Sequence, residues 1–149
     1  MHSDLQLRSA ERSDLKSLLE LYRQLHPADP ILSTKDAEQI FERFQHYSGS
    51  AILVGFSGLA LVTTCALVVV PNLTRGGAPY AVIENVVTDI EHRRKGYGRA
   101  VLKEAIAAAW RLGCYKVTLL TGSKNPATLR FYQDCGFEQS KTGFQVRRS

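Results

Sequence analysis

The sequence predicts one α/β domain of the mixed α+β type, with helices on both faces of a mixed, mostly antiparallel sheet. Its 149 residues are enough to bury one hydrophobic core. Stretches with the two-residue period of a strand alternate along the chain with stretches that have the period of a helix. Neither a repeat nor a long linker divides the chain, so we expect the domain to span residues 1–149.

The first third of the chain predicts a strand and two helices. The segment "LQLRSA" at Leu5–Ala10 is typical of a short strand. Leucines at three- and four-residue spacing then predict a helix that ends before Pro27. Ser33 is a suitable N-cap for a second helix. The apolar side of that helix is expected to carry Ile40, Phe41 and Phe44.

Three strands are predicted in the middle of the chain. Ala51–Phe56 and Leu59–Val70 are apolar and are joined by the short turn "SG", which indicates a hairpin. The segment Pro71–Pro79 is rich in turn residues and leads into a third strand at Tyr80–Thr88.

The last third predicts two helices that alternate with strands. A helix over Tyr97–Leu112 ends at Gly113, and a strand over Cys114–Gly122 follows. Asn125 is an N-cap with proline at the first helical position behind it, so another helix begins there. Thr142–Arg148 predicts a closing strand or hairpin. The strands before and after the helix at 97–112 should lie parallel in one sheet, joined by a right-handed crossover.

The turn before the helix at 97–112 is dense in cations and glycines. Its members are Arg93, Arg94, Lys95, Gly96, Gly98 and Arg99. The glycines let the backbone turn sharply and expose consecutive N–H groups at a helix N-terminus, which carries about half a positive charge. Such an end is suited to phosphate, although a solvated basic junction has the same pattern. The sequence is neither a P-loop nor a dinucleotide fingerprint.

Composition limits the class of protein. A net charge of +5 and a pI near 9.3 fit nucleic acid, an acidic surface or an anionic small molecule as partner. The apolar runs are too short to span a bilayer and the N-terminus lacks a signal region, so we expect no membrane contact and a cytoplasmic location. Three widely spaced cysteines predict reduced core thiols, and no metal-ligand pattern is present.

Two segments resemble signatures of the GNAT superfamily of N-acetyltransferases. The stretch "VVTDIEHRRKGYGRAVL" is similar to its acetyl-CoA signature, in which R/Q-x-x-G-x-G/A opens a helix. Arg93, Gly96 and Gly98 fill the three defining positions. The stretch "NPATLRFYQDCGF" resembles the second signature, an Asn, then Phe-Tyr, then Gly-Phe. The resemblance covers essentially the whole chain and implies a single acetyltransferase domain with acetyl-CoA as cosubstrate.

The resemblance also implies a cofactor site. Backbone amides from Arg94 to Arg99 would hold the diphosphate of coenzyme A, and Asn125 would contact the pantetheine arm. The strand residues before the turn would pair with that arm and with the acetyl carbonyl like an added strand. The full set is Val86, Val87, Thr88, Arg93, Arg94, Lys95, Gly96, Tyr97, Gly98, Arg99 and Asn125.

Two residues are candidates for acid–base catalysis. The resemblance points Tyr132 at the sulfur, where its phenol would protonate the departing thiolate as a general acid. The amine must lose a proton before it attacks. Glu84 is the carboxylate of the 80–88 strand and could accept that proton directly or through water, but it also fits a surface carboxylate. Strict alternation puts Glu84 with Val86 and Thr88 on one face, and Asn85 with Val87 on the other.

Several segments are similar to the glucosamine-6-phosphate N-acetyltransferase branch of the family. They are "IENVV", "GCYKVTLL", "FYQDCGF" and "FQVRR". On this resemblance Glu84 and Asn85 line the sugar site and Arg147 binds the sugar phosphate. The chain departs from the branch in having Asn85 where the branch has Asp, and in its longer loop "TGSKNPATL". Arg147 and Arg148 also fit a solvated basic tail.

The leading hypothesis is an enzyme that transfers acetyl from acetyl-CoA to a primary amine of a small molecule by direct attack. A regulatory module that binds acetyl-CoA without turnover is the alternative. A nucleic-acid binder is disfavoured, since the sequence has no recognition-helix or aromatic RNA-binding signature. We therefore expect neither nucleic acid nor a membrane as partner. The sequence leaves the oligomeric state open, and a strand at Thr142–Arg148 could pair across a homodimer.

Overall fold

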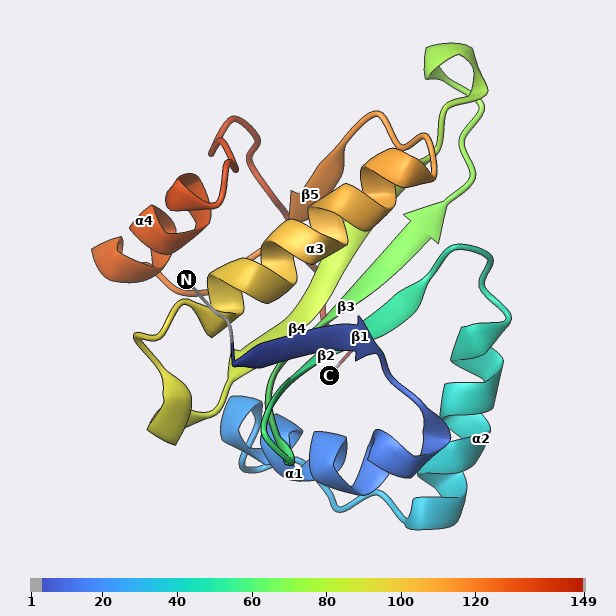
Figure 1. Ribbon diagram of the computed structural model, residues 1–149. Coiled ribbons are helices and arrows are strands. Elements are labelled where there is room, and N and C mark those ends of the chain that lie inside the picture. The colour runs from blue at the N-terminus through green and yellow to red at the C-terminus, as the bar shows by residue number, and fades with distance from the viewer. Residues whose placement is uncertain (1–3, 149) are drawn as a thin grey trace.

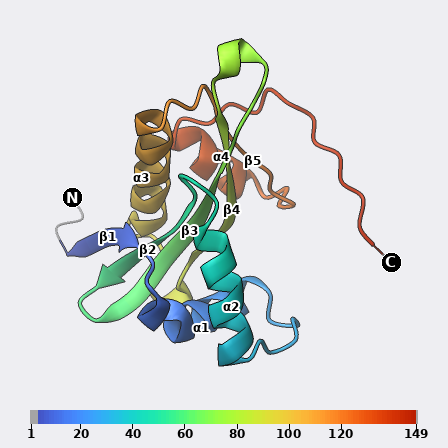
Figure 2. The ribbon, with the colours of Figure 1, turned by 90° about the vertical axis from the view of Figure 1, so that its right-hand side faces the viewer.

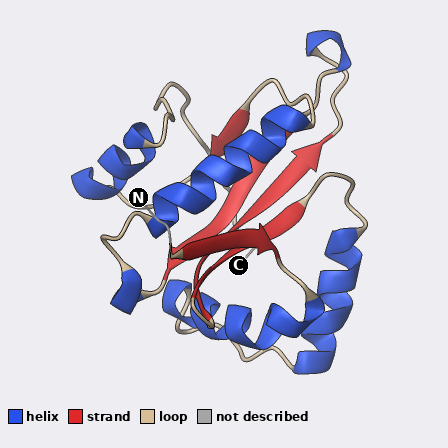
Figure 3. Cartoon of the chain, in the orientation of Figure 1, coloured by secondary structure: helices blue, strands red, loops and turns tan. Residues whose placement is uncertain are grey.

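Helices cover both faces of one five-stranded sheet in the computed structural model, which describes residues 4–148 (Figure 1; Figure 3). The strands are β1 (Leu5–Ser9), β2 (Ala51–Ser57), β3 (Ala60–Val70), β4 (Tyr80–Thr88) and β5 (Val117–Leu119). The helices are α1 (Leu15–Leu25), α2 (Thr34–Gln45), α3 (Tyr97–Arg111) and α4 (Pro126–Asp134). Over the described range, no helix combines the length and the apolar character that a membrane crossing requires.

The sheet is antiparallel except at one edge. Its strands lie side by side in chain order, and the β1–β2, β2–β3 and β3–β4 pairs are antiparallel. The β4–β5 pair is parallel, and α3 connects its two strands. The predicted mixed fold class and the predicted strand–helix–strand unit are both confirmed.

Each face of the sheet has its own hydrophobic core (Figure 2). On the side of α3 the buried residues are Leu53, Cys65, Leu67, Ala81, Ile83, Val101, Leu102, Ala105, Ala109, Cys114 and Cys135. On the side of α1 and α2 they are Ala10, Leu15, Leu18, Ala37, Phe41 and Val54. The alanines of α3 keep the helix close to the sheet, so its N-terminus lies at a fixed place beside the end of β4.

Three predicted helix boundaries are confirmed by their caps. The Ser33 hydroxyl accepts a hydrogen bond from the Asp36 amide at 3.1 Å, and Asn125 Oδ1 accepts one from the Ala127 amide at 3.0 Å. Gly113 follows α3 with a φ of +79°, a left-handed conformation that glycine adopts without steric cost. Local capping chemistry therefore sets where these helices begin and end.

The predicted closing strand is wrong. Thr142–Arg148 pairs with no strand among the described residues, and the chain after α4 runs as an extended segment away from the rest of the molecule (Figure 2). The segment passes close to Leu120, because a Cβ at Gly143 would lie 2.8 Å from Leu120 Cδ2. The alternating pattern is that of a strand, but a strand also needs a neighbouring edge.

Two further predictions are too broad. The strand predicted over Cys114–Gly122 pairs only at Val117–Leu119. Within residues 4–148 its only neighbour is β4, and the two strands separate after Ile83. Ile40 is exposed, whereas Phe41 beside it is buried, so the apolar side of α2 is narrower than predicted.

Candidate active site

β4 contains a β-bulge near its middle. Thr64 of β3 pairs with Val87, and Ala66 pairs with Glu84. The single residue between them on β3 therefore faces two residues of β4, Asn85 and Val86. Asn85 has a φ of +53°, a left-handed conformation that asparagine tolerates better than most residues. The bulge bends β4 and changes which face its later side chains occupy.

The predicted faces of β4 are wrong because of this bulge. Strict alternation places Glu84 on the same face as Val86 and Thr88. In the structure, Ile83 and Val86 both pack into the core beside α3, although they are three residues apart. Glu84 directly follows Ile83 and therefore lies on the opposite face, the side of α1. Asn85 is the extra residue that breaks the alternation.

β4 also loses β5 as a neighbour at this point. The last pair between the two strands is Ile83 with Leu119, whereas β4 continues to Thr88 beside β3 (Figure 3). Within the described part of the chain, the edge of Glu84–Thr88 on the β5 side therefore has no adjacent strand. An extended ligand can pair with such an edge as an added strand.

The turn that leads into α3 has the backbone of an anion site. Arg94 and Gly96 both have left-handed φ values, +63° and +79°. Left-handed residues that alternate along a turn bring backbone N–H groups together into a concave cradle. The first helical hydrogen bond of α3 runs from the Ala100 amide to the Gly96 carbonyl. The Gly98 and Arg99 amides before it therefore have no acceptor within the helix.

The cations of this turn surround the cradle with uncompensated charge. Arg93, Arg94, Lys95 and Arg99 are all exposed, and none of them forms an ion pair within residues 4–148. The Arg93 Nε donates to the Thr88 carbonyl at 3.2 Å, which ties the turn to the end of β4. These charges add to the field of the α3 N-terminus.

The Tyr97 side chain has a structural contact. Its ring is buried, and its hydroxyl donates to Asp4 Oδ2 at 2.5 Å, at the start of β1. The predicted contact of Tyr97 with coenzyme A is therefore one through its backbone amide and not through its phenol.

Gly98 brings three elements together. A Cβ at this position would lie 3.1 Å from Thr88 Oγ1 in β4 and 3.3 Å from Phe131 Cζ in α4. The absence of a side chain therefore lets the start of α3 approach both elements. Tyr132, the next residue of α4, packs against the α3-side core beside this junction.

The Tyr132 phenol is half-buried and stays protonated. Burial, and then the proximity of Cys135 and Cys65, raise the pKa of Tyr132 above its usual value. Its ring meets those of Phe131 and Phe137 edge-on, with centroids 5.2 Å and 6.2 Å away. A neutral phenol in apolar surroundings can donate a proton and is a poor base at neutral pH.

The cysteines are buried thiols and not nucleophiles. Burial raises the pKa of Cys65 to about 12 and also raises the pKa values of Cys114 and Cys135. All three are free, as predicted. A thiol with a raised pKa has little thiolate at neutral pH, so these residues lack the activation that covalent catalysis needs. No cluster of three potential metal ligands is found among residues 4–148.

The positions of Asn125 and Arg147 do not test the roles predicted for these two residues. The Asn125 carboxamide caps α4 through its oxygen, and the residue itself is exposed. Arg147 is exposed and belongs to the segment after α4, whose end runs away from α3 (Figure 2). Both roles stay predictions.

Polar contacts that the sequence did not predict hold the residues around the turn from Arg93 to Arg99, which we call the cofactor turn. Gln24 of α1 bonds to Asp89 and Ile90, and Asp4 bonds to Tyr97. These partners lie more than 60 residues apart along the chain, so no local pattern could reveal them. The bulge did leave a signal, because a lone asparagine interrupts the apolar alternation of β4.

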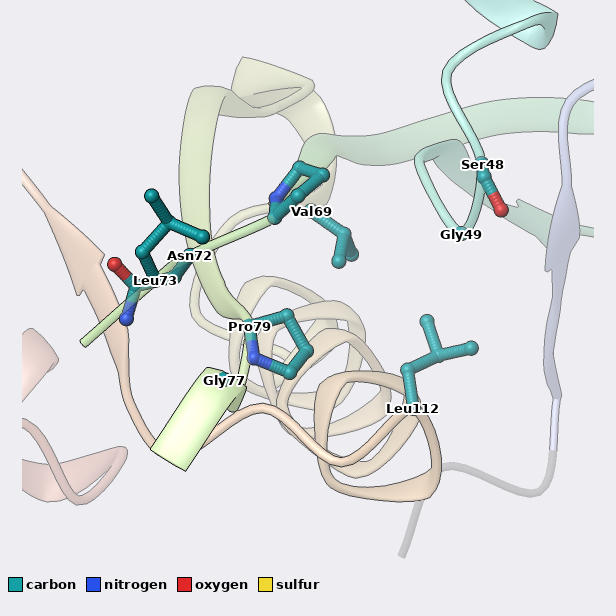
Figure 4. A pocket seen from close by; sticks show the side chains of 9 residues that line it. Ser48, Gly49, Val69, Asn72, Leu73, Gly77, Pro79 and Leu112 are labelled. Carbon is teal, nitrogen blue, oxygen red and sulfur yellow. The ribbon is translucent and has the colours of Figure 1, made fainter. Parts of the chain in front are cut away.

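A pocket of about 480 Å³ lies at the other end of α3 (Figure 4). Leu112 lines it from the C-terminus of α3, together with Val69 and the loop around Leu73. It is far along the helix from the turn with the cations, so it is separate from the site described above.

Comparisons with known proteins point to one family. Residues 15–137 match the acetyltransferase (GNAT) family. The chain is 34% identical over 134 residues to a glucosamine 6-phosphate N-acetyltransferase of Trypanosoma brucei brucei, across 90% of this chain and 89% of the relative.

Solved structures show the same likeness. A structure from Agrobacterium tumefaciens, described as an acetyltransferase, has 49% identity and a TM-score of 0.92 and covers 96% of this chain and 99% of its own. The glucosamine-6-phosphate N-acetyltransferase of Arabidopsis thaliana has 25% identity and a TM-score of 0.84, and the match covers 97% of both chains. Since the match runs through nearly the whole fold, this chain belongs to the GNAT family of acetyl-CoA-dependent N-acetyltransferases.

Proposed function

We propose that this enzyme acetylates the amine of glucosamine 6-phosphate or of a closely similar amino-sugar phosphate. The observation that carries the proposal is the similarity, over about nine-tenths of both chains, to the glucosamine 6-phosphate N-acetyltransferase of Trypanosoma brucei brucei. A plant structure of the same named activity adds support at lower identity.

The structure weakens one objection to this substrate. Asn85 stands where the resembling branch carries Asp. In this chain the residue occupies the bulge with a left-handed φ, and Asn and Asp are the two non-glycine residues that best tolerate that conformation. The exchange therefore preserves the bulge that separates β4 from β5, while it removes one negative charge near the acceptor.

The proposed cofactor site combines two features, the edge of β4 that lies beyond its pairing with β5 and the turn before α3. The diphosphate of acetyl-CoA is proposed to bind the amides of the turn from Arg94 to Arg99, with the exposed cations around it. The pantetheine arm would pair with the free edge of Val86, Val87 and Thr88. Asn125, at the start of α4, would flank the arm from the other side. These groups bind and orient the cosubstrate and exclude water from its thioester.

The proposed chemistry uses one residue on each side of the sheet. Glu84, on the α1 face, accepts the proton of the amine directly or through water, and the amine attacks the acetyl carbon. Backbone donors near Val87 stabilise the charge that develops on the acetyl oxygen. The C–S bond then breaks, and Tyr132, on the α3 side, donates its proton to the departing thiolate. The extra proton left on the nitrogen after the attack goes to solvent, from which Tyr132 is reprotonated. No covalent intermediate with the enzyme is needed.

A homodimer in the cytoplasm is part of the same proposal. Phe144 and Val146 are 91% and 97% exposed and alternate with polar residues. Their segment pairs with no strand among residues 4–148. A second copy is proposed to cover them, with Arg147 carried along to bind the sugar phosphate. Reduced cysteines support the location. A Phe144→Ser/Val146→Ser variant should sediment as a monomer where the native protein sediments as a dimer.

The proposal is tested by amine-dependent release of the coenzyme A thiol. Glucosamine 6-phosphate, glucosamine and spermidine would be compared as acceptors at saturating acetyl-CoA. We expect the highest kcat/KM with glucosamine 6-phosphate and a much lower value with glucosamine, which lacks the phosphate. Equal rates with both sugars would exclude phosphate recognition. Calorimetric binding of acetyl-CoA without thiol release for any amine would favour a regulatory module.

A further inference from the structure

The Gln24 side chain joins α1 to the segment between β4 and α3. Its Nε2 donates to Asp89 Oδ1 at 2.8 Å, and its Oε1 accepts from the Ile90 amide at 2.9 Å. One carboxamide therefore uses its donor and its acceptor on two successive residues that lie more than 60 positions away in the sequence. Such a bidentate contact fixes both the position and the direction of the chain that it holds.

Asp89 is held from three sides. Its second carboxylate oxygen lies 2.6 Å from His92 Nδ1, and its amide donates to the Val62 carbonyl of β3 at 2.8 Å. The bonds with Gln24 and then with His92 lower the pKa of Asp89, so the carboxylate is charged at neutral pH. The His92 ring in turn stacks on Tyr97, the first residue of α3, with centroids 6.5 Å apart.

This segment has little else to hold it. It contains the short helix η3 (Ile90–His92), none of whose residues is buried, and Ile90 is 64% exposed. The segment connects the two halves of the proposed cofactor site. It follows Thr88, the last residue of β4, and leads to Arg93, the first cation of the turn. Without an apolar anchor, polar contacts must set the distance between those halves.

We propose that Gln24 is a positioning residue for acetyl-CoA: through Asp89 and Ile90 it holds the turn before α3 in the geometry that binds the diphosphate. The inference rests on the proposed cofactor site. Gln24 touches no reacting atom, and it acts from α1, the helix on the Glu84 face of the sheet. It therefore also sets the position of that helix relative to the cofactor turn.

The test is calorimetric titration of the full chain with acetyl-CoA and with S-acetylpantetheine, which lacks the diphosphate. Gln24→Met keeps the length of the side chain and removes both hydrogen bonds. We expect its Kd for acetyl-CoA to rise about fivefold, in line with the net value of such bonds. Its weak affinity for S-acetylpantetheine should be unchanged. Ser17→Met, an exposed and uncharged site on the same helix, is the control and should match the native protein.

A complementary exchange makes the test sharper. Gln24→Glu keeps the acceptor for the Ile90 amide but places a carboxylate against Asp89, so it should weaken acetyl-CoA binding at least as much. The double variant Gln24→Glu/Asp89→Asn restores a donor and an acceptor to the bridge and should recover most of the affinity.

The outcomes separate this inference from the proposed function. Native-like acetyl-CoA binding by Gln24→Met, an equal loss for both ligands, or no recovery in the double variant would overturn the positioning role. If the native protein binds no acetyl-CoA, the proposed cofactor site itself is wrong, and the inference falls with it.

Discussion

At the scale of single residues, the proposed chemistry depends on how burial raises the pKa of one phenol, that of Tyr132. Tyr132 packs between two aromatic rings beside the junction of β4, α3 and α4, and this environment raises its pKa. The raised value keeps its proton in place over the whole physiological range. Burial raises the pKa values of the three thiols in the same way, which fits the proposed mechanism without a cysteine nucleophile.

Replacement of Tyr132 by Phe should lower kcat by about 100-fold or more, the usual effect of losing a positioned acid, with little change in the KM for acetyl-CoA. Because the pKa of Tyr132 is raised, any alkaline loss of native activity due to this group should occur at higher pH than an ordinary tyrosine would give, and the variant should lack it. Steady-state rates against pH measure both effects. Tyr115→Phe, an exposed tyrosine elsewhere, is the control, and an equal loss there would refute the assignment.

Replacement of Glu84 by Gln should lower kcat/KM for the amine at neutral pH by about 10-fold to 100-fold if the carboxylate is the base. The deficit should shrink as pH rises toward about 10, because the amine then loses its proton without help. The measurement is the ratio of native to variant rates across pH. A ratio that does not change with pH would assign Glu84 to binding and not to proton transfer.

At the scale of elements, the sequence was sufficient to predict helix ends and turns wherever neighbouring residues alone determine them. Ser33, Asn125 and Gly113 mark helix ends by their own hydrogen bonds or backbone freedom, and the predicted boundaries are confirmed within one or two residues. The glycines and cations before α3 likewise identified the turn in which the structure places the left-handed residues Arg94 and Gly96. These signals need only a few neighbouring residues.

The failures concern contacts between distant elements. The bulge at Asn85 depends on how β4 meets β3, and it places Val86 on the face opposite Glu84. The strand predicted at Thr142–Arg148 has no partner edge among the residues that the structure describes. The bonds of Gln24 to Asp89 and Ile90 cross between α1 and the cofactor turn. Pattern and propensity say nothing about which edge or side chain will be near.

The two ends of α3 allow a matched test of the cofactor turn. Gly96 and Gly113 both have a φ of +79°, before and after the same helix. Alanine at either position should cost about 1–2 kcal/mol of stability, because a Cβ is strained in that conformation. Only Gly96→Ala should also weaken acetyl-CoA binding, by tenfold or more, since it reshapes the cradle. Calorimetric titration with acetyl-CoA measures the affinity of both variants, and thermal unfolding measures their stability. Equal affinities of the two variants for acetyl-CoA would show that the cradle does not bind the cofactor.

At the scale of the whole molecule, an ion pair between the half-exposed Arg8 and the buried Asp14 links β1 to the start of α1. Asp14, with its side chain 8% exposed, accepts from Arg8 through both oxygens at 2.6 Å and 2.9 Å, and from the Glu11 amide at 2.7 Å. The bonds with Arg8 hold the pKa of Asp14 below its usual value. The contact sets the direction in which the chain leaves β1 for α1.

This pair predicts an acid-sensitive fold. A lowered pKa in the folded state stabilises the protein above the usual carboxyl value, and the contribution is lost as pH falls through the folded value. Asp14→Asn should therefore lower the free energy of unfolding by about 2 kcal/mol at pH 7, with the gap to the native protein closing toward pH 2. Denaturant unfolding across pH measures it, with exposed Asp29→Asn as control. A gap that is the same at pH 2 and pH 7 would contradict the ion-pair account.

The central claim is that one end of the molecule, where β4 leaves β5 and α3 begins, holds acetyl-CoA. A crystal structure of the complex with coenzyme A tests it most directly. The account predicts the diphosphate on the amides between Arg94 and Arg99, the pantetheine arm along Val86–Thr88, and the sulfur within hydrogen-bonding reach of the Tyr132 hydroxyl. Coenzyme A bound elsewhere, for example in the pocket beside Leu112 at the far end of α3, would contradict it.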